Sequence, residues 1–324
     1  MNDKVDGVVS VYKPKGLTSH DIIDEIRRHY HLNAGHAGTL DPMAQGVLVV
    51  FLGKALKLLS YLPPVSLDKV YLLRITLGVT TDTYDATGKA LQIHNGNVDF
   101  SNEEILQALK TFIGEIDQCP PAFSAVKIAG KRAYNLARSG ETPEIPARKV
   151  HIHSIKLLKD YVSGEHRNLL LRMHCGRGTY VRSVAHDLGQ KLGCGGHLSY
   201  LLRERVGIFT SQNSFPLWKI KQELPFINEK AFLKSSEILP FPTFIVKKEL
   251  EIDIQKGKQL AFADLKSAAS NTDDVFAANS DDPKFQIVSE DGRLLAIYKP
   301  EIPKQQIQSA FHAKLNPARV FLQE

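Results

Sequence analysis

The chain has 324 residues, 43% hydrophobic and 23% charged, with 41 Lys and Arg against 35 Asp and Glu and a formal net charge of +6. This composition is typical of a globular protein and excludes a largely disordered chain or a collagen-like repeat; the length suits two domains. Residues 241–324 contain 11 basic and 12 acidic residues, so residues 1–240, with 30 and 23, carry the whole positive excess. That excess weakly favours a polyanionic partner.

The cysteines and the N-terminus indicate a compartment. Cys119, Cys175 and Cys194 are far apart and form no Cys-x-x-Cys pattern, which argues against a disulfide framework and a cysteine-rich zinc site. The first residues contain no basic segment followed by an apolar stretch, so no signal peptide or membrane span is expected. We therefore expect a cytoplasmic protein with reduced thiols.

The first elements are a strand, a helix and a loop. Val8–Tyr12 predicts a short strand that ends at a Lys-Pro-Lys-Gly turn. A helix follows to about Tyr30, capped by Thr18 or Ser19 and carrying a stripe of isoleucines. The segment Asn33–Gln45 is rich in glycine, is broken by a proline and predicts a loop.

Two strands and a second helix come next. Gly46–Leu52 and Val70–Gly78 predict strands, and Thr80–Gly88 predicts a polar loop. The Ser-x-x-Glu capping box at Ser101–Glu104 predicts a helix that continues to about Ile113. Its apolar face is expected to contain Ile105, Leu106, Leu109 and Phe112.

The middle of the chain continues with mixed elements. Helices are predicted over Lys131–Ser139 and Tyr180–Leu192, each ended by a glycine, and strands over His151–Leu158 and Leu169–His174. Strands and helices alternate without the regular repeat of a doubly wound sheet, so the pattern favours an α+β fold.

A domain boundary is predicted at Leu239–Pro242, where two prolines occur and the charge balance changes. It separates residues 1–240 from residues 241–324. A polar stretch, Ser267–Pro283, predicts a loop in the second domain. Two apolar runs around an Asp-Gly turn signal predict a hairpin in a small β-rich module: Phe285–Val288 and Leu294–Tyr298.

The densest group of chemically useful residues lies in the first loop. It reads Gly35-His36-Ala37-Gly38-Thr39-Leu40-Asp41-Pro42-Met43-Ala44-Gln45-Gly46. The glycines permit unusual backbone conformations, and Pro42 biases Asp41 away from the helical region. The carboxylate is thus held on a shaped loop between a helix and a buried strand, a typical place for a catalytic group. The alternative is an ordinary turn with Asp41 as a cap or turn residue.

This segment closely resembles the motif Gly-His-x-Gly-Thr-Leu-Asp-Pro-x-Ala-x-Gly of the bacterial tRNA pseudouridine synthase B (TruB) family. Further segments resemble the other motifs of that family in the expected order: Lys69–Tyr71 with Leu77–Asp85, Pro120–Tyr134, and Cys175–Arg182 with Leu192–Leu198. The resemblance implies a mixed, mainly antiparallel sheet of the pseudouridine synthase type flanked by helices. It also implies a small β-rich C-terminal domain of the PUA type or a divergent form of it.

The resemblance implies an isomerase that breaks the N-glycosidic bond of a uridine, turns the uracil and rejoins it through carbon 5. The expected partner is the T-arm stem-loop of tRNA, at the uridine conventionally numbered 55, with no metal or organic cofactor and a monomeric enzyme. Asp41 matches the essential aspartate, acting by direct attack or by elimination through a glycal. Tyr71 matches a stacking tyrosine and Arg182 the arginine that pairs with the aspartate; from the pattern alone, they are a core residue and an exposed helix residue.

The resemblance also implies substrate-binding residues: His36, Leu201, Asp85, Lys127, Arg132 and Tyr180. A wider basic set interleaved with aromatic residues is expected to attract RNA phosphates: Lys127, Lys131, Arg132, Arg138, Arg172, Arg177, Arg203 and Arg205. The alternative for the basic stretch is an exposed helix face.

Other functions fit the sequence less well. A tRNA-folding chaperone would bind without catalysis, and a glycosidase would need a second acid beside Asp41, for which Asp85 is the candidate. The pair His151 and His153 offers metal ligands from one side of a strand, as does the pair at residues 29 and 31, but no third ligand is evident from spacing. No metal site is therefore expected.

Overall fold

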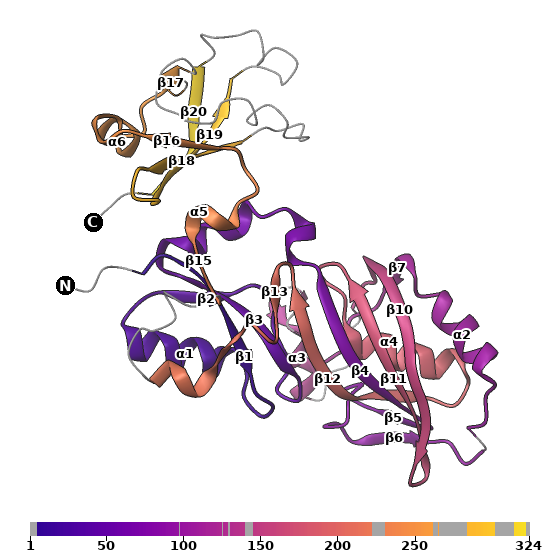
Figure 1. Ribbon diagram of the computed structural model, residues 1–324. Helices are drawn as coiled ribbons and strands as arrows, with labels where there is room; N and C mark the ends of the chain where they lie inside the picture. The colour runs from indigo at the N-terminus through magenta and orange to yellow at the C-terminus, as the bar shows by residue number, and fades with distance from the viewer. Residues whose placement is uncertain are drawn as a thin grey trace.

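Two β-sheets, one large and one small, organise the chain (Figure 1). The structure is a computed structural model that describes residues 5–96, 98–124, 126–128, 130–139, 145–221, 231–261, 265, 284–301 and 314–321. The predicted loop over Ser267–Pro283 and the glycine expected to end the helix at residue 139 lie outside these residues.

The large sheet is mainly antiparallel, as expected. Its main path is β14 (Phe215–Pro216), β1 (Gly7–Lys13), β3 (Gln45–Leu52), β12 (Gly196–Val206), β4 (Lys69–Leu77), β11 (His166–Cys175), β10 (Arg148–Ser163) and β7 (Gly114–Gln118). Three short strands pair with strands inside this path: β2 (Ala34–His36) with β3, β13 (Phe209–Thr210) with β12 and β15 (Phe232–Lys234) with β1. Only the β1–β14 and β3–β12 pairs of this sheet are parallel among the described strands.

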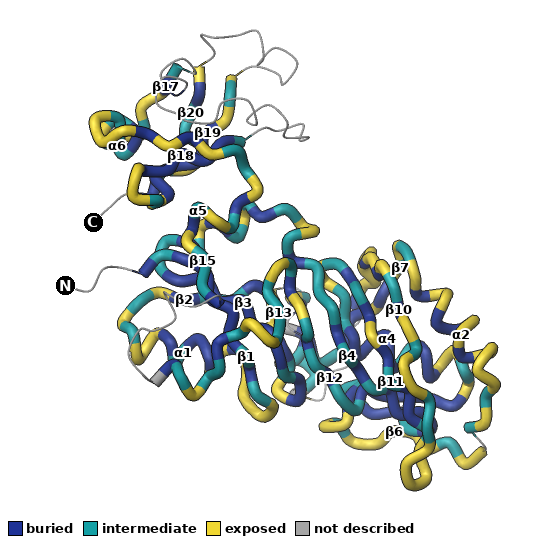
Figure 2. The backbone as a smooth tube through the Cα atoms, viewed as in Figure 1, coloured by how far each residue is buried: buried dark blue, intermediate teal, exposed yellow. Residues whose placement is uncertain are grey.

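Helices cover the large sheet in two places. The helix α1 (Ser19–Tyr30) packs its isoleucines against β1 and β3, and α2 (Asn102–Lys110) and α4 (Val181–Lys191) share a core with β4, β11 and β12. Figure 2 shows buried backbone at the centre of this sheet and exposed backbone on the outer side of α2. The remaining helical turns are η1 (Gly53–Ser60), η2 (Pro64–Leu67), α3 (Ala133–Arg138), η3 (Leu217–Lys221), α5 (Ser235–Ile238) and α6 (Lys248–Gln255).

Local helix signals are confirmed. Thr18 is the N-cap of α1 and shares a capping box with Asp21, and Ser101 does the same with Glu104 for α2. Leu106 is an exception, because it is 44% exposed, while Ala108 takes a buried place on that helix.

Several boundaries differ from the prediction. The first loop contains β2, the helix predicted from residue 131 begins at residue 133 after β9 (Lys131–Arg132), and β10 is twice as long as predicted. The hairpins β5 (Val79–Thr81) with β6 (Ala90–Ile93) and β8 (Lys127–Ile128) with β9 were not predicted. These short strands exist through pairing, which local composition does not reveal.

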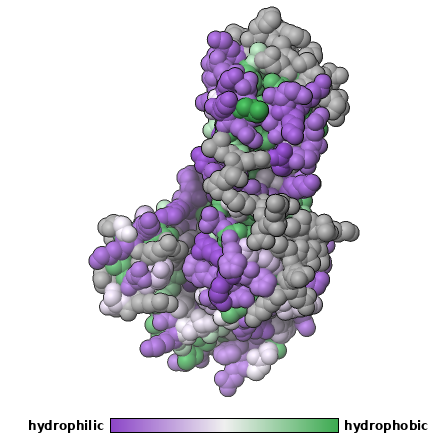
Figure 3. All heavy atoms as spheres, turned by 90° about the vertical axis from the view of Figure 1, so that its left-hand side faces the viewer, coloured by the Kyte–Doolittle hydropathy of each residue, from purple (hydrophilic) through white to green (hydrophobic). Residues whose placement is uncertain are grey.

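The small sheet contains the predicted hairpin. Its order is β16 (Thr243–Val246), β18 (Phe285–Ser289), β19 (Leu294–Pro300), β20 (Lys314–Val320) and β17 (Leu260–Ala261), and β18 pairs antiparallel with β19. It contacts the large unit: the Tyr61 hydroxyl donates to the Ala318 carbonyl at 3.1 Å, and Leu58 and Ile297 belong to one apolar cluster. On the face shown in Figure 3, polar side chains predominate over both units.

The cysteine prediction is confirmed, because all three cysteines are free. In the part of the chain that the structure describes, no helix combines the length and the apolar character needed to cross a membrane.

The strand β3 requires glycine at its start. Gly46 has φ +108°, and a Cβ there would lie 2.2 Å from the Arg203 carbonyl oxygen. Gly114 has a similar φ of +102° but open space around its Cβ position. We expect Gly114→Ala to cost about 1–2 kcal/mol for the backbone conformation, and Gly46→Ala to cost at least about 2 kcal/mol more because of the clash. Urea denaturation of both variants measures the difference; equal losses would contradict the close-approach argument.

Candidate active site

Asp41 lies on the loop between β2 and β3. Hydrogen bonds from α1, from the turn before α1 and within the loop itself shape this loop. The Ser19 hydroxyl on α1 donates to the Leu40 carbonyl and accepts from the Leu40 amide, at 3.0 and 2.8 Å. The Gly16 amide donates to the Pro42 carbonyl at 2.8 Å, and the Ala44 amide to that of Asp41 at 3.0 Å. The loop is therefore fixed on both sides of the carboxylate.

Arg203 binds the backbone of the same loop. It comes from β12, is fully buried, and donates to the carbonyls of Val47 at 2.7 Å and Gly38 at 3.1 Å. The prediction that Arg203 contributes to an RNA-binding surface is wrong, because its guanidinium is enclosed by backbone carbonyls. Sequence spacing gave no signal for this role.

Arg182 pairs with Asp41 as expected. It is the second residue of α4, and its Nε lies 2.9 Å from Asp41 Oδ2 while its Nη2 donates to Oδ1 at 3.1 Å. The guanidinium also donates to the carbonyls of Thr83 at 3.1 Å and Phe123 at 3.0 Å. Arg182 is 5% exposed, which excludes the alternative of an exposed helix residue. A two-point contact of this kind fixes the orientation of a carboxylate.

Asp85 is a buried acid behind this ion pair. Its Oδ2 lies 3.8 Å from Arg182 Nε, and its Oδ1 accepts from the Thr87 amide at 2.9 Å and the Thr87 hydroxyl at 2.6 Å. The preceding residue, Tyr84, has φ +62° and stacks on the ring of His186 at 3.8 Å between centroids. Since Oδ1 is occupied by this turn and Oδ2 faces the Arg182 guanidinium, Asp85 supports Arg182 and the turn.

Tyr71 projects from β4 into the same space. It is 5% exposed, and burial raises its pKa to about 12, although a hydrogen bond from the Arg203 guanidinium acts in the opposite direction. The phenol is therefore neutral at physiological pH. Tyr71 belongs to the main apolar core, as its pattern alone predicts, and it also lines the cleft. Its stacking role stays a prediction.

One cleft of about 1140 Å³ brings most of the predicted site residues together. Those that line it are His36, Asp41, Tyr71, Asp85, Tyr180, Arg182 and Leu201. Burial lowers the pKa of His36, and its Nδ1 has no hydrogen-bond partner among the described residues. The buried Ser124 hydroxyl, which also lines the cleft, likewise has no hydrogen-bond partner among the described residues. The prediction did not include Ser124. These polar atoms are available to a ligand.

Lys127 is not among the described residues that line the cleft, and the side chain of Arg132 lies outside the described residues. Lys127 is exposed on β8, and the backbone of Arg132 pairs with it on β9.

Two lysines beside the cleft were also missed. Lys13, at the end of β1, is buried and donates to the carbonyls of Pro14 at 2.9 Å and Leu17 at 2.6 Å. Lys69 begins β4 and lines the cleft. Burial lowers the pKa of each to about 8. Only the position of Lys69 in the second family motif pointed to it.

Comparison with known proteins defines the class as pseudouridine synthase. Residues 27–181 match a family model described as TruB family pseudouridylate synthase (N terminal domain), and residues 182–240 match one described as tRNA pseudouridylate synthase B C-terminal domain. The chain belongs to the TruB family.

Similar proteins cover most of the chain. It is 43% identical over 251 residues to tRNA pseudouridine synthase B of Caldanaerobacter subterraneus subsp. tengcongensis, covering 77% of this chain and 82% of that protein. It is 37% identical over 294 residues to the protein of the same name from Corynebacterium glutamicum, covering 90% and 94%.

A solved structure has the same arrangement along nearly the whole chain. A crystal structure of a Cbf5-Nop10-Gar1 complex contains a chain with a TM-score of 0.67 and 26% identity, covering 98% of this chain and 85% of that one. The expected fold class is therefore confirmed.

The partly buried Lys69 predicts a pH dependence of stability. Its folded pKa of about 8 lies below the unfolded value of about 10.4, so between these values the unfolded chain binds more protons and stability rises with pH. We expect the unfolding free energy of the parent protein, relative to Lys69→Met, to increase by about 2 kcal/mol from pH 7.5 to 9.5. Urea titrations at both pH values measure this; Lys57→Met is a control with no such change expected. Parallel pH curves for parent and Lys69→Met would contradict the lowered pKa.

Proposed function

We propose that this chain isomerises uridine to pseudouridine in tRNA, at the T-loop uridine conventionally numbered 55. The single observation that carries the proposal is the two-point pairing of Asp41 with the buried Arg182 in the cleft of a TruB-family fold. The names of the similar proteins support tRNA as the substrate. The T-arm as the binding element rests on the family resemblance.

The reaction needs an anionic group at the sugar. The bond from C1′ to N1 breaks, the bond from C1′ to C5 forms, and the hydrogen on C5 is replaced by one on N1, so the overall change is an isomerisation. An ionised Asp41 serves either by attacking C1′ or by taking a proton from C2′ in a glycal route. Both routes need an unprotonated carboxylate that is aimed at the sugar, and the two contacts from Arg182 fix its orientation. Neither requires a metal or an organic cofactor.

The uracil must leave its stack before Asp41 reaches it. Tyr71 offers a buried aromatic face beside the carboxylate, and Leu201 adds an apolar wall. Because the pKa of Tyr71 is about 12, we assign the phenol to stacking and hydrogen bonding rather than to acting as a free base. His36 and Ser124 present polar atoms without described partners, suited to the edges of a flipped base or its neighbours.

Basic residues beyond the catalytic group would meet the RNA backbone. We assign this role to Lys127, which is exposed on β8, and to Arg132 on β9, with Tyr180 of the cleft lining, because cations attract phosphates without reading sequence. We propose a monomeric, cytoplasmic enzyme, in keeping with free cysteines and a tRNA substrate.

We also propose the division into residues 1–240, the catalytic unit, and residues 241–324, a small β-rich unit of the PUA type or a divergent form. The family-model match ends at residue 240, and the five-stranded sheet begins with β16 at residue 243. The near-neutral charge of the second unit favours a supporting role in RNA binding.

Asp41→Asn tests the reaction. We expect a loss of more than about 1,000-fold in the single-turnover rate on an unmodified tRNA transcript, because the amide cannot attack or take a proton. Chemical mapping of pseudouridine at nucleotide resolution is the measurement. Asp24→Asn, an exposed acid on α1, is the control and keeps full activity.

Two results would overturn parts of this proposal. Full product with Asp41→Asn would remove the catalytic assignment, and product only outside the T-loop would remove the T-arm assignment while leaving the synthase. Accelerated refolding of a misfolded transcript by Asp41→Asn would reveal a chaperone function beside catalysis.

Arg182→Lys separates positioning from charge. Lysine keeps the cation but cannot bind both carboxylate oxygens and the two carbonyls that the guanidinium contacts. We expect a rate loss of about 100-fold, with tRNA affinity within about threefold of the parent protein. Single-turnover kinetics and filter binding measure the two quantities. A rate within a few-fold of the parent value would show that charge alone suffices.

A further inference from the structure

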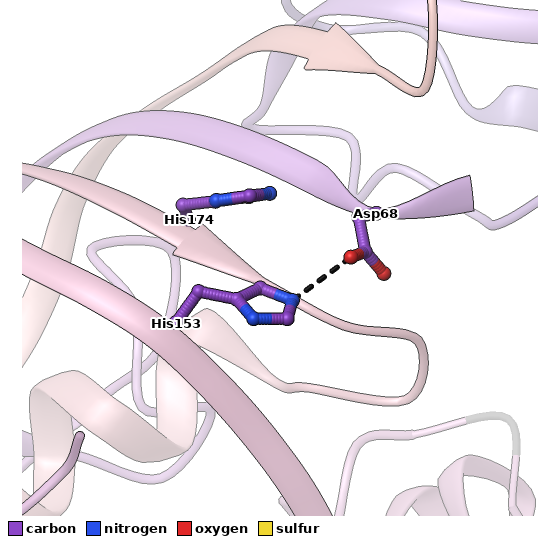
Figure 4. Close-up of side chains that lie close together, drawn as sticks. All are labelled: Asp68, His153 and His174. Atoms are coloured by element: carbon purple, nitrogen blue, oxygen red, sulfur yellow. Dashed lines mark hydrogen bonds and ion pairs between the residues drawn. The ribbon is translucent and has the colours of Figure 1, made fainter. Parts of the chain in front are cut away.

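A second cluster of chemically active side chains lies outside the cleft. Asp68, His153 and His174 come from three separate segments, and one ligand atom from each lies within 4.8 Å of the others (Figure 4). His153 Nε2 is 2.8 Å from Asp68 Oδ2, and the rings of the two histidines are 4.4 Å apart at 38°. None of the three lines the cleft.

Backbone hydrogen bonds and strand register bring these residues close together. The Asp68 amide donates to the Val65 carbonyl at 3.1 Å, and its carbonyl accepts from the Gly207 amide at 2.8 Å, so the residue before β4 is fixed from both sides. The strands β10 and β11 carry a register irregularity at His153: Ile152 pairs with Cys175, but Ser154 pairs with His174. A bulge of this kind re-aims a side chain, here toward His174.

The cluster lies on the face of the sheet opposite the main core. In β11, Met173 and Cys175 are buried in that core, and strand alternation directs His174 to the other face. Figure 4 shows the three side chains converging on one another there. The cluster is partly exposed, since the Asp68 and His153 side chains are 13% and 34% accessible. Water therefore has access for a further coordination position.

We propose that Asp68, His153 and His174 bind a divalent first-row transition metal ion, with Zn²⁺ as the probe. Two imidazoles and one carboxylate are ligands that such ions accept, with solvent at the open positions. With metal–ligand bonds of about 2.0–2.1 Å, tetrahedral ligand atoms lie about 3.3 Å apart. This spacing lies between the 2.8 Å from His153 Nε2 to Asp68 Oδ2 and the 4.8 Å within which all three ligand atoms are found. The ion would tie β10 and β11 to the start of β4.

One nearby charge opposes binding. Val70 on β4 pairs with His174 on one side and with Arg205 on the other, which places the guanidinium on the same face as the cluster. At that position the guanidinium repels a cation held by the cluster. Removing this cation should therefore strengthen metal binding, which is a directional test that a random surface site would not satisfy.

Calorimetric titration of the chelator-treated full chain with Zn²⁺ tests the proposal. We expect one ion per chain with a Kd at or below about 1 µM and a Tm increase of about 3 °C. His153→Gln and His174→Gln should each weaken binding by more than about tenfold, and Arg205→Gln should tighten it. His166→Gln, a histidine on the same strand β11, is the matched control and should bind like the parent chain.

The outcomes distinguish this site from the active site. No binding by the parent chain, or unchanged binding by both His153→Gln and His174→Gln, would overturn the proposal. Loss of binding in His151→Gln alone would also overturn it, since that ring lies 4.7 Å from His153 and would then be the true ligand. Pseudouridine formation by both ligand variants should stay within about twofold of the parent rate, because the cluster is outside the cleft.

Discussion

The burial of the Arg182 guanidinium is the constraint on which the site depends. A buried cation is tolerated when it is paired, and here the partners of the guanidinium come from three segments: Asp41, Thr83 and Phe123. Because one side chain must satisfy all three, the loop before β3, the turn after β5 and the segment before β8 are positioned together. The pairing thus joins three segments that line the cleft, and it also sets the direction of the Asp41 carboxylate.

Arg203 is a second buried cation that fixes this loop. Its guanidinium is fully buried against backbone carbonyls, and the glycine at position 46 is required because β12 passes so close. Two arginines therefore fix opposite sides of one short loop, one through its carboxylate and the other through its backbone. Two of the 30 basic residues counted in residues 1–240 are therefore not available to RNA, since they are buried in the protein interior.

Local signals predicted the fold where a few adjacent residues decide the structure. The capping boxes at Thr18 and Ser101 and the Asp-Gly turn at residues 291–292 specify their elements by short-range hydrogen bonds and turn geometry. β12 was not predicted, because its sequence mixes buried Leu201 with a buried arginine whose partners are distant in sequence. In the site, the resemblance indicated Asp41, Tyr71 and Arg182. Neither spacing nor resemblance showed that the Ser124 hydroxyl lies in the cleft lining.

The metal cluster shows why one part of a site cannot be derived from spacing alone. The His-x-His pattern at residues 151–153 gives two histidines of one strand, but it does not show that the bulge at His153 brings this ring 4.4 Å from that of His174 on the next strand and within 2.8 Å of Asp68. A single extra residue in β10 changes which side chains meet, and a residue count along the chain contains no record of it. The catalytic loop differs in this respect, because the glycines and the proline that shape it belong to the same segment as Asp41. Sequence reasoning therefore succeeds where the chemistry and its geometric cause lie in one segment, and it fails where strand register assembles the site.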